Sequence, residues 1–137
     1  MDILEIEFIK LLGIKRDNSS LILEPKEKLN NHIGSLHAGA LYTLAEVQSG
    51  LFLQDSFKEF SADAVPLLRC SKTTCKNSAT SVVKAFASAN KKDLEKFKDN
   101  FLKKGRATIS IKVELLDSKK RIVMLGEFKW FVQRVNK

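Results

Sequence analysis

Glu46 is the residue of this sequence whose surroundings best suit acid–base chemistry. It is the single ionisable carboxylate between Leu29 and Gln54, and that stretch holds no Lys or Arg, although 29% of the chain is charged. Residues 38–52 are apolar on nearly every side, which is typical of a helix that other elements enclose. Because burial disfavours a charged carboxylate, enclosure would raise the pKa of Glu46 in the direction that a general base at neutral pH requires.

The start of this predicted helix could supply the partner groups. The first turn of a helix presents N–H groups without intrahelical acceptors, together with the positive end of the helix dipole. Ala38 and its neighbours lie at this turn and could donate to a carbonyl oxygen. Asn31, which has both donor and acceptor atoms, could hold a water or orient a substrate. A carboxylate that accepts a proton or attacks a carbonyl, with donors for an oxyanion, is what thioester hydrolysis requires.

Each of these residues also has a purely structural interpretation. Asn31, next to a second Asn, is most simply a turn residue. His37 would more often begin the helix or bond to the backbone than carry a proton, and Gly39 could serve only close packing. Glu46 could be a chance carboxylate on a partly exposed stripe of polar residues at spacings of three and four, namely Tyr42, Thr43, Glu46 and Ser49.

The remaining sequence predicts one α+β domain over residues 1–137 with the apolar helix at its centre. An antiparallel sheet curled around that helix is the natural packing, since the period-two segments bury one face each. The expected elements are a helix over 2–12, a strand over 20–29 interrupted by Pro25, strands over 64–76 and 79–89 joined by a turn at 76–78, a basic helix over 90–104 capped by Asn90 and Gly105, and a hairpin of strands over 105–116 and 121–135.

In element order and in one motif, the sequence resembles the hotdog-fold thioesterases, in particular the phenylacetate-pathway (PaaI-like) branch and a relative of it with an inserted helix. Those enzymes carry an Asn, five further residues, His-Gly-Gly, and an Asp or Glu nine residues after the His. Here Asn31 precedes His37 by six residues, His37-Ala38-Gly39 stands in the His-Gly-Gly place, and Glu46 follows His37 by nine. Ala38 departs from the first glycine, at the position whose N–H polarises the thioester carbonyl in that family.

The resemblance implies a hotdog fold, with a sheet wrapped around a long helix and an extra helix between late strands. It also implies an acyl-CoA hydrolase with Glu46 and Asn31 as catalytic residues. His37, Ala38 and Gly39 would bind the substrate. No cofactor is expected, since coenzyme A is part of the substrate.

Two other functions remain open at this point. His32 lies fourteen residues before Glu46, which resembles the His and Glu of hotdog acyl-carrier dehydratases, but their Pro-Gly is replaced here by Ala40-Leu41. A domain that only binds an acyl thioester or a protein partner is the third hypothesis, which the alanine at position 38 allows. Assays for thiol release and for interconversion of 3-hydroxyacyl and enoyl thioesters would separate the three.

Composition limits the partners. The net charge of +8 and the pI near 9.6 suit an anionic ligand, but the excess is mostly scattered lysine, so nucleic acid is not expected. Cys70 and Cys75 are expected to be reduced, and no Cys or His has zinc-ligand spacing. The acidic start and the lack of a long apolar run predict a cytoplasmic protein without a membrane span. A sheet wrapped around one helix leaves apolar strand residues to cover, which predicts a homodimer or homotetramer.

Overall fold

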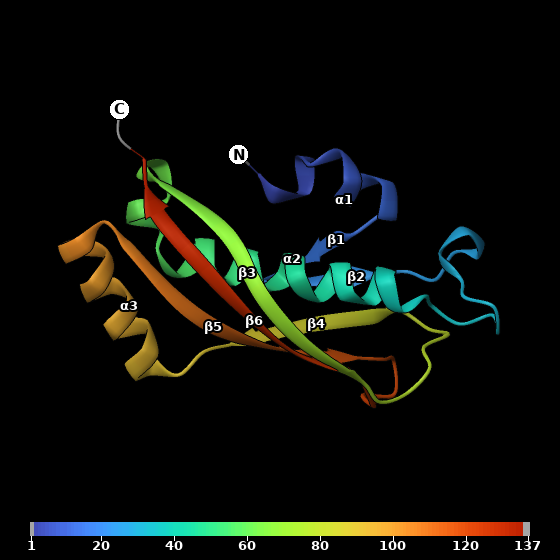
Figure 1. The fold of residues 1–137 in the computed structure, drawn as a ribbon. Helices are drawn as coiled ribbons and strands as arrows, with labels where there is room; N and C mark the ends of the chain where they lie inside the picture. The colour runs from blue at the N-terminus through green and yellow to red at the C-terminus, as the bar shows by residue number, and fades with distance from the viewer. Residues whose placement is uncertain (1, 136–137) are drawn as a thin grey trace.

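The computed structural model describes residues 2–135, apart from the side chains of residues 60 and 61, and has an antiparallel sheet that curls around one long helix (Figure 1). The six strands lie in the order β1-β2-β4-β5-β6-β3. Their bounds are Lys15–Asp17 (β1), Ser20–Leu23 (β2), Ala64–Cys75 (β3), Val83–Ser88 (β4), Arg106–Leu116 (β5) and Ile122–Arg134 (β6). The helices are Glu7–Leu12 (α1), Ala38–Ser56 (α2) and Lys91–Lys104 (α3), with short 3₁₀ turns at Ile3–Glu5 (η1), Glu27–Leu29 (η2) and Lys58–Asp63 (η3).

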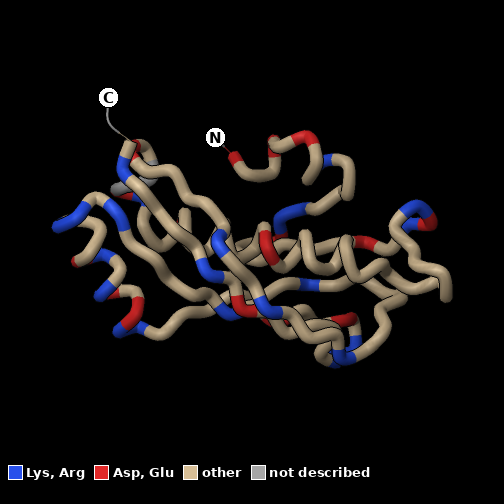
Figure 2. Tube along the Cα trace, viewed as in Figure 1, with Lys and Arg blue, Asp and Glu red and all other residues tan. Residues whose placement is uncertain are grey.

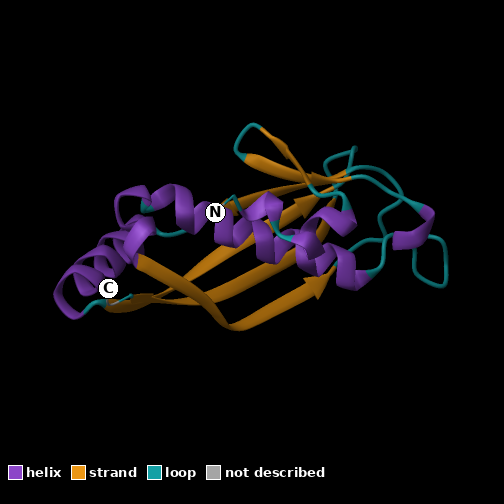
Figure 3. Ribbon diagram, turned by 90° about the horizontal axis from the view of Figure 1, so that it is seen from above, coloured by secondary structure: helices purple, strands orange, loops and turns teal. Residues whose placement is uncertain are grey.

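The helix α2 lies across one face of the sheet, where it contacts β2, β3, β4, β5 and β6 (Figure 3). Leu44, Ala45 and Leu51 are fully buried in this contact. The N-terminal segment with α1 lies on the side of α2 away from the sheet (Figure 1). Because both sides of α2 are covered, a helix with almost no polar face is stable here.

The hairpin of β5 and β6 lies inside the sheet, between β4 and the edge strand β3. Strict alternation along β5 turns its apolar side chains toward α2 and its polar ones outward, as expected for a half-buried antiparallel strand. In β6, Phe128 pairs with Ile111, and Trp130 pairs with Ile109, on the same inner face. The residues of β5 buried in this way are Ala107, Ile109, Ile111, Val113 and Leu115.

The helix α3 is inserted between β4 and β5 and packs at one end of the sheet (Figure 1). The side chain of Asn90 caps its start by accepting a hydrogen bond from the Lys92 N–H at 2.8 Å. Gly105 ends it in the left-handed conformation, with φ of 72°. Phe97 and Phe101 are the buried residues of this helix, so α3 adds two aromatic rings to the core.

Charged residues avoid the central helix. Lys and Arg are spread over α3 and over β3, β5 and β6, whereas α2 contains neither (Figure 2). This distribution is the one that the charge-poor sequence of α2 predicts, and it concentrates positive charge on the outer surface of the sheet and on α3.

The α+β fold class and the inserted helix are confirmed, but three local predictions need correction. Residues 15–17 form a strand, β1, that the sequence did not reveal, because its side chains are all exposed and carry no apolar alternation. The strand expected over residues 20–29 ends at Leu23, and residues 27–29 form the turn η2, because Pro25 lacks the N–H that a strand ladder needs. Segment 76–78 is not a hairpin turn, since β3 pairs with β6 and β4 pairs with β2 and β5, so the chain crosses from one edge of the sheet into its interior.

Candidate active site

Glu46 lies in the middle of α2, and its side chain lines a cavity. The residue is partly buried, and this burial raises the pKa of its carboxyl above the usual value of 4.5. Among the residues that the structure describes, none donates a hydrogen bond to this carboxylate or forms an ion pair with it. A partly dehydrated carboxylate without a protein partner is available to accept a proton from a bound water or substrate.

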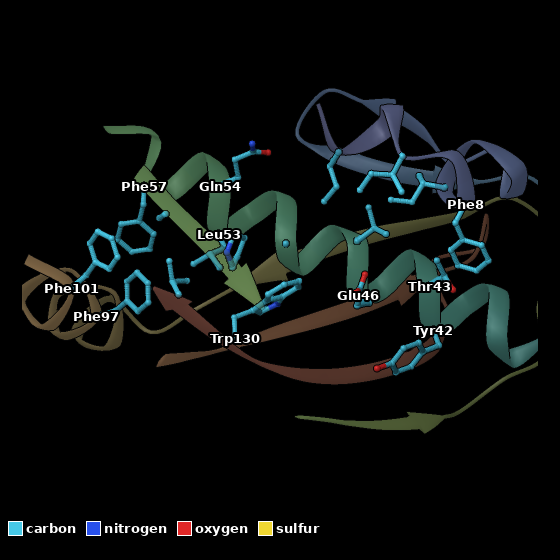
Figure 4. A pocket seen from close by; sticks show the side chains of 18 residues that line it. Phe8, Tyr42, Thr43, Glu46, Leu53, Gln54, Phe57, Phe97, Phe101 and Trp130 are labelled. Atoms are coloured by element: carbon cyan, nitrogen blue, oxygen red, sulfur yellow. The ribbon is translucent and has the colours of Figure 1, made fainter. Parts of the chain in front are cut away.

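The cavity beside Glu46 measures about 620 Å³, a volume in the range of small-molecule sites. Its walls come from α2, from the N-terminal segment, from β3 and β6, and from α3 (Figure 4). Tyr42, Thr43 and Glu46 are close together at one part of it, whereas aromatic rings of Phe57, Phe97 and Phe101 lie at the other end (Figure 4). The cavity therefore has a polar part around the carboxylate and a long apolar part.

The N-terminus of α2 is capped by His37, as the simpler interpretation of that residue predicts. Its Nδ1 accepts a hydrogen bond from the Gly39 N–H at 2.8 Å, and its carbonyl accepts from the N–H groups of Ala40 and Leu41. No acceptor for the Ala38 N–H exists within residues 2–135. Of the predicted substrate-binding residues, Ala38 thus offers the donor, since it is exposed, while the Gly39 N–H is already used by His37.

Asn31 holds the loop before α2 together. Its Oδ1 accepts hydrogen bonds from the N–H groups of Ile33 and Ser35, both at 3.0 Å. Its Nδ2 donates to the Ser35 Oγ at 2.8 Å. Because these local bonds use both ends of the amide, the side chain has a structural role in this conformation, and Asn31 does not line the cavity.

Within one chain, the structure does not bring the Ala38 N–H and Glu46 together. Glu46 lies eight positions after Ala38 in α2, which corresponds to about 12 Å along the helix axis. One thioester carbonyl would have to lie within roughly 3 Å of both the oxyanion donor and the attacking group. The two groups therefore belong to different reaction centres unless a second chain contributes one of them.

Several residues around the cavity could not be identified from the sequence as parts of one site. Tyr42 bonds through its hydroxyl to the Ser71 Oγ at 2.8 Å, which joins α2 to β3. Ser49, predicted to share the polar stripe of Glu46, is instead fully buried and accepts a hydrogen bond from the Trp130 Nε1 at 2.8 Å. A buried Trp needs an acceptor for its N–H, and this need is the one feature of the sequence that points to a polar partner for Trp130.

The sequence from residue 9 to residue 132 matches a family model described as a domain of unknown function, DUF4442. The chain belongs to the DUF4442 family. No protein of curated function matches the sequence significantly.

Solved structures share the fold. A Pseudomonas aeruginosa protein of unknown function, named a probable thioesterase, superimposes with a TM-score of 0.84 at 23% identity, covering 96% of this chain and 91% of the other. A Haemophilus influenzae thioesterase gives 0.75 at 13% identity, with coverage of 98% and 87%. A Bacillus halodurans protein determined with CoA gives 0.72 at 16% identity, with coverage of 91% and 74%. The hotdog fold expected from the resemblance is thereby confirmed.

Metal-binding clusters and membrane-spanning helices are absent from the part of the chain that the structure describes. Within residues 2–135, no group of three or more His, Cys, Asp or Glu side chains is placed to bind a metal ion. None of the helices described has both the length and the apolar character needed to cross a bilayer. Cys70 and Cys75 are unpaired and exposed on β3.

Proposed function

We propose that this protein hydrolyses acyl-CoA thioesters at a site built from two copies of the chain. The observation that carries the proposal is Glu46, a carboxylate without a partner among the described residues, which lines a largely apolar cavity and has its pKa raised by burial. A general base needs a pKa near the working pH and access to a water molecule. An acyl group needs an apolar pocket. The thioesterase names of structures with the same fold add support at the level of reaction class.

In the proposed reaction, a water molecule lies between Glu46 and the carbonyl carbon of the thioester. The water oxygen bonds to this carbon while Glu46 takes the proton, and the negative charge that develops on the carbonyl oxygen is stabilised by an Ala38 N–H. The C–S bond then breaks, and the proton held by Glu46 neutralises the departing thiolate of CoA. Direct attack by the carboxylate, followed by hydrolysis of the anhydride, uses the same groups.

The Ala38 N–H in this mechanism would come from the partner subunit, because the helix separates Ala38 from Glu46 of the same chain by about 12 Å. The edge of β3 is a suitable place for the second copy. This strand of twelve residues pairs on one side only, with β6, and exposes Val65 and Leu67. Long unpaired edges with apolar residues favour pairing with another strand. Through Tyr42 and Ser71, β3 also lies beside the N-terminal half of α2.

The carrier of the acyl group in the proposal is coenzyme A. The CoA found with the Bacillus halodurans protein motivates this choice, and the Lys and Arg residues of β3, β5, β6 and α3 could meet the phosphates of the nucleotide (Figure 2). An acyl carrier protein, which presents the same thioester on a phosphopantetheine, is the alternative carrier.

The test is a panel of short, medium, long and aryl acyl-CoAs, assayed for release of free thiol by the purified full-length protein. We expect Glu46→Gln to reduce kcat/KM for the best substrate by about 10²–10⁴-fold, because glutamine keeps the volume but accepts no proton. Asp55→Asn is the matched control, since it makes the same change at an exposed position of α2 outside the cavity. If Glu46→Gln hydrolyses this substrate as fast as the parent, the mechanism is wrong.

The alternatives give other outcomes in the same panel. Hydration of an enoyl-CoA without thiol release, with loss of that activity in His32→Ala, would favour the dehydratase. Stabilisation of the protein by acyl-CoA without any turnover would favour a binding module. No contact in the structure favours either of these over hydrolysis, since His32 is exposed and does not line the cavity.

A further inference from the structure

The apolar part of the cavity follows one face of α2 away from the carboxylate. Glu46, Gly50, Leu53 and Phe57 all line the cavity. Their spacings of four, three and four residues place them on one face of the helix. From Glu46 to Phe57, the helix rises by about 16 Å. The cavity is therefore elongated, with the candidate base toward one end and, apart from Gln54, mostly apolar side chains along the rest.

Aromatic rings close the far end. Phe57 and Phe97 lie with their ring centroids 4.6 Å apart, and Phe97 and Phe101 with theirs 6.4 Å apart. Two of the three rings come from α3, the helix inserted between β4 and β5, so the insertion supplies the floor of the cavity (Figure 4). All three residues are buried. A ligand that reaches this floor must end in an apolar group, because a polar end would lose its hydration there.

Gly50 lines the cavity between the carboxylate and the aromatic rings. A Cβ atom at this position would lie 3.3 Å from the Trp130 Cζ2, closer than ordinary contact, and 3.4 Å from the Ile3 Cδ1, at the near limit of ordinary contact. The Trp130 ring cannot easily withdraw, because its Nε1 is held by the buried Ser49 hydroxyl at 2.8 Å. A larger side chain at position 50 would therefore press on Trp130 and Ile3 and project into the passage, which is the part of the cavity between the carboxylate and the aromatic floor.

We propose that the substrate carries an unbranched aliphatic acyl chain of about twelve carbons, which runs from Glu46 past Gly50 and ends against Phe57, Phe97 and Phe101. The length follows from the 16 Å span, because an extended chain of single bonds advances roughly 1.2 Å per bond. A short acyl group would leave the apolar part of the cavity without contacts. This assignment rests on the proposed thioesterase function, since it takes Glu46 as the place of the carbonyl.

Binding of non-hydrolysable S-alkyl-CoA thioethers tests the assignment separately from catalysis. Isothermal titration of the full-length protein with ethyl, octyl, dodecyl and hexadecyl derivatives should show Kd falling about fourfold for each added methylene. The gain should stop near the dodecyl chain, where the aromatic floor is reached. An equal Kd for the ethyl and dodecyl derivatives would overturn the proposal.

Gly50→Leu should block the passage. We expect Kd for dodecyl-CoA to rise at least about 250-fold relative to the parent, because four methylenes at fourfold each separate octyl from dodecyl and both chains then end before the same obstacle. The ratio of the octyl and dodecyl Kd values should then approach one. Asp55→Leu adds the same side chain at an exposed position of α2 outside the cavity, and the parental ratio should persist in it. If Gly50→Leu does not fold by circular dichroism, Gly50→Ala is used, with about a tenfold rise expected. A parental ratio in a folded Gly50 variant would overturn the proposal.

Failure of this proposal and failure of the proposed function look different. Suppose that Kd falls with alkyl length in the parent but not in Gly50→Leu, while no acyl-CoA releases thiol. The assignment of the acyl chain to this cavity is then supported, and the proposed hydrolysis is wrong. If short acyl-CoAs are hydrolysed and Kd is independent of alkyl length, the proposed hydrolysis is supported and the assignment of the acyl chain to this cavity is wrong.

Discussion

Glu46 and Ala38 would carry the proposed chemistry through two different physical effects. Glu46 acts through dehydration, because partial burial without a protein partner shifts its proton equilibrium toward neutral pH. Ala38 acts through its backbone, because it is the first residue of α2 and its N–H has no acceptor within the described part of the chain. Alanine keeps the N–H that a glycine would offer at this position, and Ala38 is exposed.

The raised pKa of Glu46 predicts how stability and activity depend on pH. A carboxyl whose pKa is higher in the folded than in the unfolded chain disfavours folding once it ionises, so its penalty is absent below 4.5 and appears as pH rises through the folded-state pKa. Glu46→Gln should therefore melt at a higher temperature than the parent at pH 8, and the difference should vanish below pH 4.5. Thermal melts across this range check the prediction, and kcat/KM of the parent should rise with pH over the same interval.

A proline at position 38 tests the backbone donor directly. Ala38→Pro removes the N–H but suits the first position of a helix, and His37 before it already has the extended conformation that a following proline requires, with φ of −65° and ψ of 139°. We expect kcat to fall by about 10²–10³-fold with the fold retained. Ala38→Val keeps the N–H at similar bulk and serves as the control in the same assay. Equal rates in the two variants would show that this N–H is not the oxyanion donor.

At the scale of elements, turns and caps fix the sheet that surrounds α2. Asp117 organises the turn between β5 and β6: its Oδ1 accepts from the Lys119 and Arg121 N–H groups at 3.0 and 2.9 Å, and its Oδ2 accepts from the Arg121 Nε at 2.9 Å. The backbone hydrogen bond from Arg121 is the main reason that the pKa of this carboxyl lies below its usual value of 3.8. The turn aligns the hairpin that places Trp130 against Gly50.

Asp117→Asn should lower the melting temperature at pH 7, because the amide cannot accept all three hydrogen bonds as well as a carboxylate does. For a carboxyl whose pKa is lowered by folding, the stabilisation is present above the unfolded value of 3.8 and is lost as pH falls through the folded-state pKa. The difference between variant and parent should therefore shrink in acid. Asp99→Asn, an exposed aspartate of α3, is the control and should leave the melting temperature unchanged. A difference that persists in acid would mean that the charge of Asp117 is not its cause.

For the whole molecule, the central question is whether two chains complete each site. In a two-fold dimer with Glu46 from one chain and Ala38 from the other, a mixed dimer of Glu46→Gln and Ala38→Pro chains contains one fully native and one doubly substituted site. Random mixing of equal amounts should then restore about a quarter of the parental activity, since half of the dimers are mixed and each has one working site. The measurement is thiol release after the two variants are refolded together.

The complementation has two clear controls. Each variant refolded alone should stay inactive, and sedimentation should give a dimer or a larger assembly at micromolar concentration. If the mixture remains as inactive as its components while the dimers exchange subunits, each chain holds its own site. A monomer in sedimentation would contradict the proposed assembly itself.

The positive surface makes a separate prediction about CoA. If lysine and arginine on the outer strands and α3 meet the phosphates, added salt should weaken CoA binding, because exposed ion pairs are screened. The Debye length falls from about 10 Å at 0.1 M to about 3 Å at 1 M ionic strength, so exposed charges are screened much more strongly at the higher concentration. Titration of CoA at both is the measurement. An unchanged Kd would mean that the net charge of +8 does not contribute to CoA binding.

The sequence by itself determined the elements whose pattern is local. The caps of α3 at Asn90 and Gly105 and the alternation of β5 follow from neighbours within a few residues, and both are confirmed. The apolar, charge-poor sequence of α2 likewise predicted a covered helix in which burial raises the pKa of Glu46. Such predictions succeed because capping and amphipathic periodicity depend on the backbone geometry of a single element.

Only the tertiary structure decided which elements meet. In the structure, β3 lies at the edge of the sheet, and the N-terminal segment, α2 and α3 line one cavity. Ser49 accepts a hydrogen bond from Trp130. The structure also showed that the amide of Asn31 is used by its own loop. Periodicity tells which side of a strand or helix is covered but not what covers it, because pairing between distant segments depends on the packing of the whole chain rather than on any local spacing.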